Sequence, residues 1–144
     1  MHSRGDRRTL FNQPPLPNAS AAIKSDLKAL AECALASGID RQALVLDPGF
    51  GFGKRGEENF EVLRNMDILG SLEYPLLAGT SRKSFIRSVL KNNMEAIAWG
   101  TAATTAAAIL NGAHIVRVHD VFAARAVADA TDRSEEHTSE LQSH

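Results

Sequence analysis

Segment 43–54 constrains the fold of this chain more than any other stretch. A short apolar run ends in a carboxylate, Asp47, and a glycine-rich loop follows it and closes on Lys54. In proteins that alternate strands with helices, ligand sites form at the carboxyl ends of the strands, where such loops emerge. The segment therefore predicts a strand over 43–47 with a ligand loop at its end.

Two other apolar runs end in polar groups. Residues 76–79 lead into the sequence Thr-Ser-Arg-Lys-Ser, which contains Lys83, and residues 114–118 lead into His119. The carboxyl ends of parallel strands meet at one edge of a sheet. We therefore expect an acid, a lysine and an Arg/His pair to share one site.

Helical spacing of apolar residues separates these runs. We expect helices over 18–37, 57–69, 84–91, 94–110 and 121–130. Asn18 or Ser20 is expected to cap the first helix, and Gly38 to end it. Strands separated by helices pair in parallel, and strands covered on both faces are almost wholly apolar. The order predicts an α/β fold.

Composition narrows the class of protein. The 144 residues suit one domain, and the net charge of −1 argues against a nucleic-acid or membrane partner attracted by bulk charge. No apolar run approaches the roughly 20 residues of a membrane span. The single cysteine, Cys33, excludes disulfide frameworks and multi-thiolate zinc sites, fits a reducing cytoplasm, and is expected to be buried. Trp99 is likewise expected to pack inside.

The last twelve residues differ from the rest of the chain. Residues 133–144 (RSEEHTSELQSH) are polar, lack apolar periodicity and resemble a translated sequencing-library adapter. We therefore expect a native domain over 1–132 and a non-native tail over 133–144.

The loop after Asp47 admits two interpretations. Asp47 can accept hydrogen bonds from ligand N–H groups, or it can be a turn residue before Pro48. The pattern G-x-G-x-x-G over 51–56 is a weak dinucleotide match, because it does not follow the strand directly. The loop either presents Phe50 or Phe52 to a flat ligand or is merely flexible.

The other two strand ends carry cations. Lys83 lies at a strand-to-helix junction rich in donors, where anions bind, and is expected to face the site. Arg117 and His119 alternate along an apolar strand and therefore share a face. They suit a phosphate or pyrophosphate clamp, with a structurally paired arginine as the alternative.

Three ordered motifs together resemble a known family. DPGFGFGK at 47–54, GTSRKS at 79–84 and RVHDV at 117–121 are similar to dihydropteroate synthases, pterin-binding barrels of the bacterial folate pathway. The resemblance implies the C-terminal half of a (β/α)₈ TIM barrel, from the end of strand 5 through helix 8, with its site at the carboxyl face. It implies a transferase that condenses para-aminobenzoate with 6-hydroxymethyl-7,8-dihydropterin diphosphate, giving 7,8-dihydropteroate and pyrophosphate.

The resemblance also implies residue roles. Asp47 should bind the pterin N–H groups, and Met1 matches a pterin contact. Lys83 should contact the pterin and the aminobenzoate pocket, which Phe52 and Ser84 border. The implied substrate-binding set is Met1, Asp47, Phe52, Gly79, Lys83, Ser84, Arg117 and His119.

Arg117 and His119 should hold the diphosphate and, with Lys83, form the catalytic set. Mg²⁺ is implied as cofactor, with its ligand in the family's earlier half, upstream of Met1, so that no metal ligand is expected in this chain. The chain is expected to be a fragment, inactive alone, of a cytoplasmic enzyme that is a homodimer when complete. Sulfonamides are the expected inhibitors; nucleic acid and membrane are not expected partners.

Two alternatives remain. One is another pterin-binding barrel, such as a methyltetrahydrofolate-dependent methyltransferase, although the Ser-Arg-Lys-Ser motif at 81–84 favours the synthase. Binding of aminobenzoate or sulfonamides separates the two. The other is a non-catalytic half-barrel that serves as an oligomerisation module, suggested by the alanine-rich stretch 94–110. Turnover by the isolated chain would exclude this second alternative.

Overall fold

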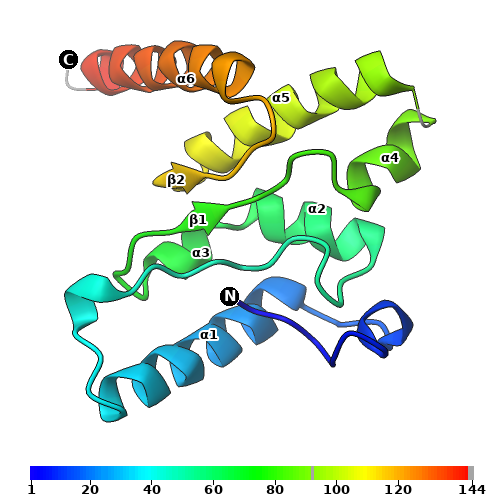
Figure 1. Cartoon of the computed structure of the whole chain (residues 1–144). Coiled ribbons are helices and arrows are strands. Elements are labelled where there is room, and N and C mark those ends of the chain that lie inside the picture. Colours follow the sequence, from blue (N-terminus) through cyan, green and yellow to red (C-terminus); the bar gives the residue numbers. More distant parts are fainter. Residues whose placement is uncertain (92, 143–144) are drawn as a thin grey trace.

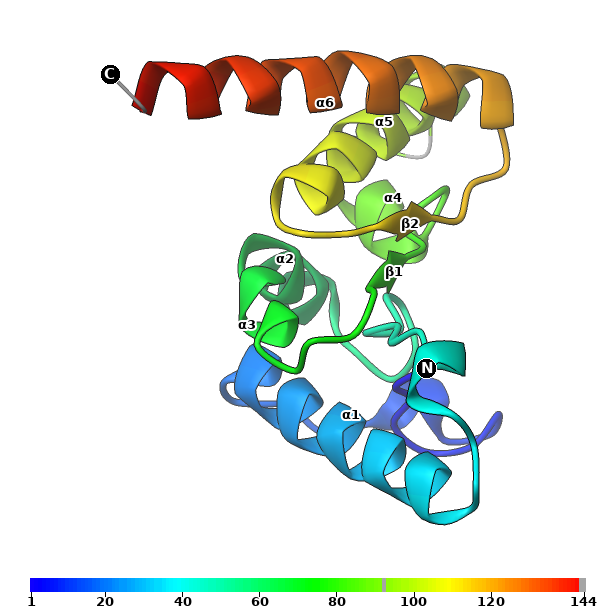
Figure 2. The ribbon, with the colours of Figure 1, turned by 90° about the vertical axis from the view of Figure 1, so that its left-hand side faces the viewer.

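The computed structural model describes residues 1–91 and 93–142 and shows a row of helices beside short parallel strands. In Figure 1, α1 and α6 lie at opposite ends of the row. Figure 2 shows β1, β2 and the N-terminal segment along one side of it. The elements are η1 (Leu10–Asn12), α1 (Ala19–Ala36), η2 (Arg41–Ala43), α2 (Gly56–Arg64), α3 (Asp67–Gly70), β1 (Leu77–Ala78), α4 (Ser84–Leu90), α5 (Met94–Leu110), β2 (Ile115–Val116) and α6 (Val121–Gln142).

The extended segments follow one another in sequence order. β1 and β2 pair in parallel, with Leu77 opposite Ile115, and a parallel bridge joins Leu46 to Leu76. On the far side of that bridge, the backbone N–H of His2 donates to the carbonyl of Asp47 at 2.8 Å. The predicted α/β class is confirmed in this form, with helices predominating over a small parallel sheet.

The predicted strand over 43–47 is wrong for most of its length. Its first residue belongs to η2, whose start is capped by Asp40 accepting from the backbone N–H of Gln42 at 2.9 Å. Only Leu46 makes a ladder contact, and Val45 is exposed. The apolar run therefore has a strand's composition, but a 3₁₀ turn occupies its beginning.

The predicted helix over 57–69 is divided in two. α2 ends at Arg64, the side-chain amide of the next residue, Asn65, donates to the carbonyl of Glu61 at 2.9 Å, and α3 begins at Asp67. A side chain that bonds the preceding turn competes with the next helical hydrogen bond. The break at Asn65 turns the chain toward β1.

The predicted helix over 94–110 is confirmed as α5, and Asn93 caps it by accepting from two backbone N–H groups. α1 also lies where expected, but Asn18 makes no side-chain cap bond. Instead Glu61 of α2 accepts from the backbone N–H groups of Ala19 and Ser20 at 3.2 and 3.3 Å. The first turn of α1 is therefore capped by another helix.

The last helix is longer than predicted. α6 continues to Gln142 instead of ending near residue 130, because no glycine or proline interrupts residues 121–142. Cys33 and Trp99 are exposed, so their predicted burial is wrong. Fewer side chains of α1 and α5 are therefore buried in the core than the apolar content of these helices suggests.

One core lies between the helices and the extended segments. Phe85 of α4 stacks on Phe50 at 6.0 Å and meets Phe60 edge-on at 5.0 Å between ring centroids. Around them the buried core includes Ile23, Leu27, Leu46, Val62, Leu63, Met66, Leu69, Leu76 and Ile86. Within residues 1–91 and 93–142, no helix is both long and apolar enough to cross a membrane.

Candidate active site

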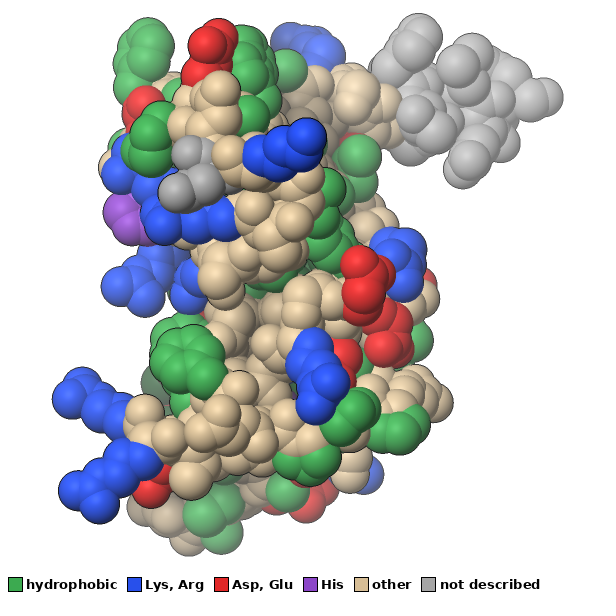
Figure 3. Space-filling view, turned by 90° about the vertical axis from the view of Figure 1, so that its right-hand side faces the viewer, with side chains coloured by type: hydrophobic (Ala, Val, Ile, Leu, Met, Phe, Trp, Pro, Cys, Tyr) green, Lys and Arg blue, Asp and Glu red, His purple; other side chains and the backbone are tan. Residues whose placement is uncertain are grey.

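The strand ends enclose a pocket of about 250 Å³. The first two predicted strand ends contribute Asp47 and Lys83, and the third contributes both Arg117 and His119. The lining residues are Met1, Asp47, Gly49, Phe50, Phe52, Gly79, Ser81, Lys83, Arg117, Val118 and His119. Figure 3 shows cationic side chains and a histidine gathered along one edge of the half of the molecule that contains α4, α5 and α6.

Asp47 is fixed at the start of the glycine loop. Its Oδ1 accepts the backbone N–H of Gly49 at 2.8 Å, the Asx-turn geometry expected of an aspartate before proline. The carboxylate is partly exposed in the pocket. The turn interpretation of Asp47 is confirmed, and because the side chain also lines the pocket, hydrogen bonding to a ligand stays a prediction.

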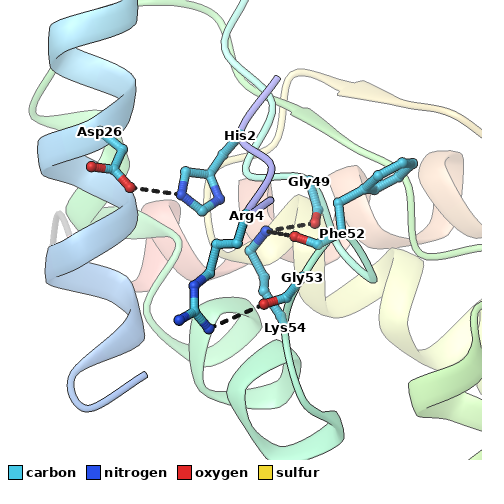
Figure 4. A network of polar contacts seen from close by, with 7 residues as sticks. All are labelled: His2, Arg4, Asp26, Gly49, Phe52, Gly53 and Lys54. Carbon is cyan, nitrogen blue, oxygen red and sulfur yellow. Dashed lines mark hydrogen bonds and ion pairs between the residues drawn. The ribbon is translucent and has the colours of Figure 1, made fainter. Parts of the chain in front are cut away.

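Lys54 holds the glycine loop from inside. Its Nζ donates to the carbonyl oxygens of Gly49 at 2.7 Å and Phe52 at 3.2 Å (Figure 4). Burial lowers the pKa of Lys54 to about 8, although the charge of Asp47 opposes this shift. The sequence motif contains Lys54, but only the fold shows that it bonds the loop's own carbonyls.

The N-terminal segment packs closely against the loop. A Cβ added at Gly49, where φ is +70°, would lie 1.9 Å from the carbonyl oxygen of His2. Arg4 donates to the carbonyl of Gly53 at 3.2 Å (Figure 4). Glycine is therefore required at Gly49 both by its backbone angle and by the approach of His2.

His2 is buried and bonded to α1. Its Nε2 lies 2.9 Å from Oδ2 of Asp26, and burial lowers the pKa of His2, with the charge of Lys54 adding to the effect. A lowered pKa favours the neutral ring, which then donates from Nε2 to the carboxylate. The contact joins the N-terminal segment to α1.

Phe52 and Lys83 form one wall of the pocket. The Lys83 ammonium lies 4.5 Å from the centroid of the Phe52 ring, a cation–π contact. Burial lowers the pKa of Lys83, while Asp47 raises it and Arg117 lowers it by smaller amounts. Of the two predicted aromatic candidates, Phe52 is partly exposed, whereas Phe50 is buried against Phe85.

Arg117 and His119 follow β2 and also line the pocket. The Arg117 backbone N–H donates to the carbonyl of Ala78 at 3.0 Å, which extends the strand pairing to the pocket. The Nδ1 of His119 lies 2.8 Å from Oγ of Ser81. Ser81 is buried, and sequence reasoning assigned it no role.

The remaining predicted site residues have different positions. Met1 and Gly79 line the pocket, and Met1 is more than half exposed. Ser84 begins α4, is exposed and does not line the pocket.

A metal site is not assembled by this chain within residues 1–91 and 93–142. No three His, Cys, Asp or Glu side chains in that part lie close enough to hold an ion. The pocket contains one carboxylate, Asp47, together with the cationic side chains of Lys83 and Arg117. These residues alone do not fit a magnesium ion, which binds oxygen ligands.

The sequence and the fold have well-defined relatives. Residues 1–119 match the family described as pterin binding enzyme. Dihydropteroate synthase of Synechocystis sp. is 38% identical over 133 residues, which are 92% of this chain and 46% of that protein. The crystal structure of Yersinia pestis dihydropteroate synthase with a sulfonamide drug has a TM-score of 0.89 at 31% identity, covering 94% of this chain and 50% of the other.

A third relative is dihydropteroate synthase of Thermus thermophilus in complex with 4-aminobenzoate. It has a TM-score of 0.81 at 34% identity, covering 89% of this chain and 52% of the other. The chain thus spans about half the length of the relatives it matches. Because the family match includes all of the pocket residues, the chain belongs to the pterin-binding enzyme family.

Proposed function

We propose that this chain supplies half of a dihydropteroate synthase and carries the residues that bind both substrates. The observation that carries the proposal is the pocket itself. One carboxylate, one aromatic wall and the cations Lys83 and Arg117 converge there in a member of the pterin-binding family. The relatives are named dihydropteroate synthases, and one is solved with 4-aminobenzoate.

The proposed reaction joins an aromatic amine to a methylene carbon. The nitrogen of para-aminobenzoate attacks the carbon that bears the diphosphate of the dihydropterin. The carbon–oxygen bond breaks, pyrophosphate leaves with the bonding electrons, and the amine loses a proton. Negative charge therefore grows on the leaving oxygen, and groups fixed there favour the transition state over the ground state.

Five of the pocket residues have a proposed task in this reaction. Asp47 accepts hydrogen bonds from the N–H groups at one edge of the pterin ring. Lys83 and Phe52 border the aminobenzoate ring, while Arg117 and His119 hold the diphosphate. The Arg117 guanidinium can give two parallel hydrogen bonds to one phosphate, which a lysine ammonium cannot reproduce.

The rest of the proposal concerns the complete protein. The parallel segments and intervening helices support assignment to the C-terminal half of a (β/α)₈ barrel, from the end of strand 5 through helix 8. We also propose that the complete protein is cytoplasmic and a homodimer, and the exposed Trp99 on α5 and Phe122 on α6 support the dimer. Mg²⁺ is proposed as cofactor with its protein ligand outside this chain, and sulfonamides as inhibitors.

The test is substrate binding to this chain by calorimetry. We expect the chain to bind inorganic pyrophosphate and a pterin. The variant Arg117→Lys should bind pyrophosphate on the order of tenfold more weakly, because it loses one charge-assisted hydrogen bond. Arg125→Lys is the control, because Arg125 lies on α6 outside this pocket and pairs with Asp129. Equal effects of the two variants would show that Arg117 is a structural arginine.

A further inference from the structure

Ser81 and His119 are joined twice across the end of the sheet. The Oγ of Ser81 lies 2.8 Å from Nδ1 of the His119 ring, and the backbone N–H of His119 donates to the same Oγ at 3.3 Å. Ser81 follows β1 and His119 follows β2, so that the contact links two strand ends. No other hydrogen bond of the His119 ring is formed within the described parts of the chain.

The two contacts favour one placement of the hydrogen atoms. A serine hydroxyl has one hydrogen to donate and accepts through its lone pairs. Because the Ser81 oxygen accepts from the His119 backbone, its hydrogen is free to point at Nδ1. A neutral imidazole that accepts at Nδ1 carries its own hydrogen on Nε2.

Ser81 is itself held in place by α5. The hydroxyl of Thr104 donates to that of Thr80 at 2.9 Å, and the Arg82 backbone N–H donates to the hydroxyl of Thr101 at 3.1 Å. Arg82 has a φ of 55°, a left-handed conformation that a non-glycine residue holds only when its surroundings impose it. The junction on either side of Ser81 is thus anchored to one helix.

We infer that Ser81 is a positioning residue that fixes the His119 ring as its Nε2–H tautomer and thereby directs an N–H donor at the anion-binding side of the pocket. The neutral ring then gives a hydrogen bond to an anion without carrying charge. This inference takes its ligand, pyrophosphate, from the proposed function. The tautomer itself is a property of the folded chain.

The first experiment observes the tautomer directly. The full chain, labelled with ¹⁵N-histidine, is studied at pH 8 by magic-angle-spinning NMR, which tolerates associated protein, and His119→Gln assigns the signals. The internal reference is His114, whose Nδ1 accepts the backbone N–H of Leu76 at 3.1 Å. We expect His119 to show a hydrogen-bonded, unprotonated Nδ1 like that of His114. A protonated Nδ1 on the neutral ring would overturn the inference without any variant.

The second experiment measures pyrophosphate binding by calorimetry at pH 8 and pH 5.5, with ring protonation read from NMR spectra at each pH. Ser81→Ala should weaken binding on the order of tenfold where the ring is neutral, the value of one hydrogen bond to a charged group. The loss should shrink to less than threefold where the ring is an imidazolium, because both nitrogens then carry hydrogens.

Ser88→Ala is the matched control. The Ser88 hydroxyl donates within α4 to the carbonyl of Phe85 at 2.7 Å and lies outside the pocket. A Ser81→Ala loss that is equal at both pH values would show a merely structural role and overturn the inference. If the unsubstituted chain bound no pyrophosphate, the proposed function would fail, while the NMR result would still decide the role of Ser81.

Discussion

Among single residues, Asp47 shapes the glycine loop and, in the proposed function, also binds the pterin. Its Oδ1 is bonded to the Gly49 backbone, which fixes the side chain before any ligand arrives. Asp47→Asn keeps the turn but replaces one acceptor by a donor. We therefore expect pterin affinity to fall on the order of 10- to 100-fold, the loss of a charge-assisted pair, with little change for 4-aminobenzoate.

Calorimetry with both ligands checks this prediction. Asp40→Asn is the matched control, because Oδ1 of Asp40 also accepts the N–H two residues later, from Gln42 at 2.9 Å, but Asp40 lies outside the pocket. Equal losses for the pterin and the aminobenzoate in Asp47→Asn would show that the substitution damages the loop and not one subsite.

Lys54 gives the stability of the chain a pH dependence. Its pKa is about 8 in the folded chain, against 10.5 for an ordinary lysine. Below pH 8 the buried charge is a full cost to the folded state. Between pH 8 and 10.5 the unfolded chain retains a proton that the folded chain has lost, so this cost declines as pH rises.

Lys54→Met removes this contribution. We compare the free energy of unfolding of the unsubstituted chain with that of Lys54→Met. The first minus the second should increase by about 2 to 3 kcal/mol from pH 7 to pH 10, because each unit by which the folded pKa is lowered corresponds to about 1.4 kcal/mol. Urea unfolding at each pH measures both. A pH-independent difference would mean that Lys54 titrates as an ordinary lysine in the folded chain.

The sequence predicted those pocket residues whose place in the pocket follows from their position at the end of a strand. Asp47, Lys83 and Arg117 meet because parallel strand ends meet. Ser81 and Lys54 were missed because their partners, the His119 ring and the loop carbonyls, are brought to them by tertiary contacts. A serine or a lysine in a loop has no periodic signal that shows what it will bond.

At the level of elements, the helices were easier to predict than the strands. α5 has the predicted bounds because its length and caps are local properties of residues 93–110. The predicted strand over 43–47 is reduced to one bridge because Asp40 caps a competing 3₁₀ turn. Short apolar runs fit several backbone conformations. Their pairing partners lie 30 residues away for Leu46 and Leu76 and 38 residues away for Leu77 and Ile115.

The loop element depends on the absence of a side chain at Gly49. Gly49→Ala would place Cβ 1.9 Å from the carbonyl of His2 at a φ of +70°, so we expect a loss of about 3 kcal/mol or more in unfolding free energy. Gly70→Ala is the matched control. Gly70 ends α3 with nothing within 4 Å of the added Cβ, and alanine there should be neutral or stabilising by up to about 1 kcal/mol. Urea unfolding compares the two, and equal effects would contradict the close approach of His2.

The end of α6 makes a separate prediction. The side chains of residues 132–135 are exposed, whereas Thr131 is buried and its hydroxyl donates to the carbonyl of Val127 at 2.7 Å. Deleting residues 133–144 should therefore change the unfolding free energy by less than about 1 kcal/mol, the size of a typical single substitution. Deleting residues 130–144 should cost more. A large loss from the shorter deletion would show that the tail docks on the domain.

For the whole molecule, the share of the relatives that this chain spans governs what it can do. It spans 46% of the Synechocystis synthase and 50% of the Yersinia structure. A parallel barrel with half its strands leaves backbone N–H and C=O groups without neighbours at two edges, and such edges associate. We expect no dihydropteroate formation by this chain alone.

A complementation assay checks this expectation. The chain is mixed or co-expressed with the N-terminal half of the Synechocystis synthase, and dihydropteroate is measured with each half alone as control. Turnover only in the mixture is the expected result. Turnover by this chain alone would contradict the half-barrel proposal.

The cap that Glu61 provides for α1 also has a consequence for the order of events during synthesis. α1 ends at Ala36 and leaves the ribosome while Glu61 is still inside the exit tunnel. Until then the first N–H groups of α1 have only water as a partner, and an isolated helix of this length is marginal. The nascent helix should therefore fray and refold repeatedly, and become permanent only when α2 docks. Synonymous codon changes that slow translation while α1 is outside the ribosome and Glu61 is still inside it would prolong this interval and favour capture by chaperones.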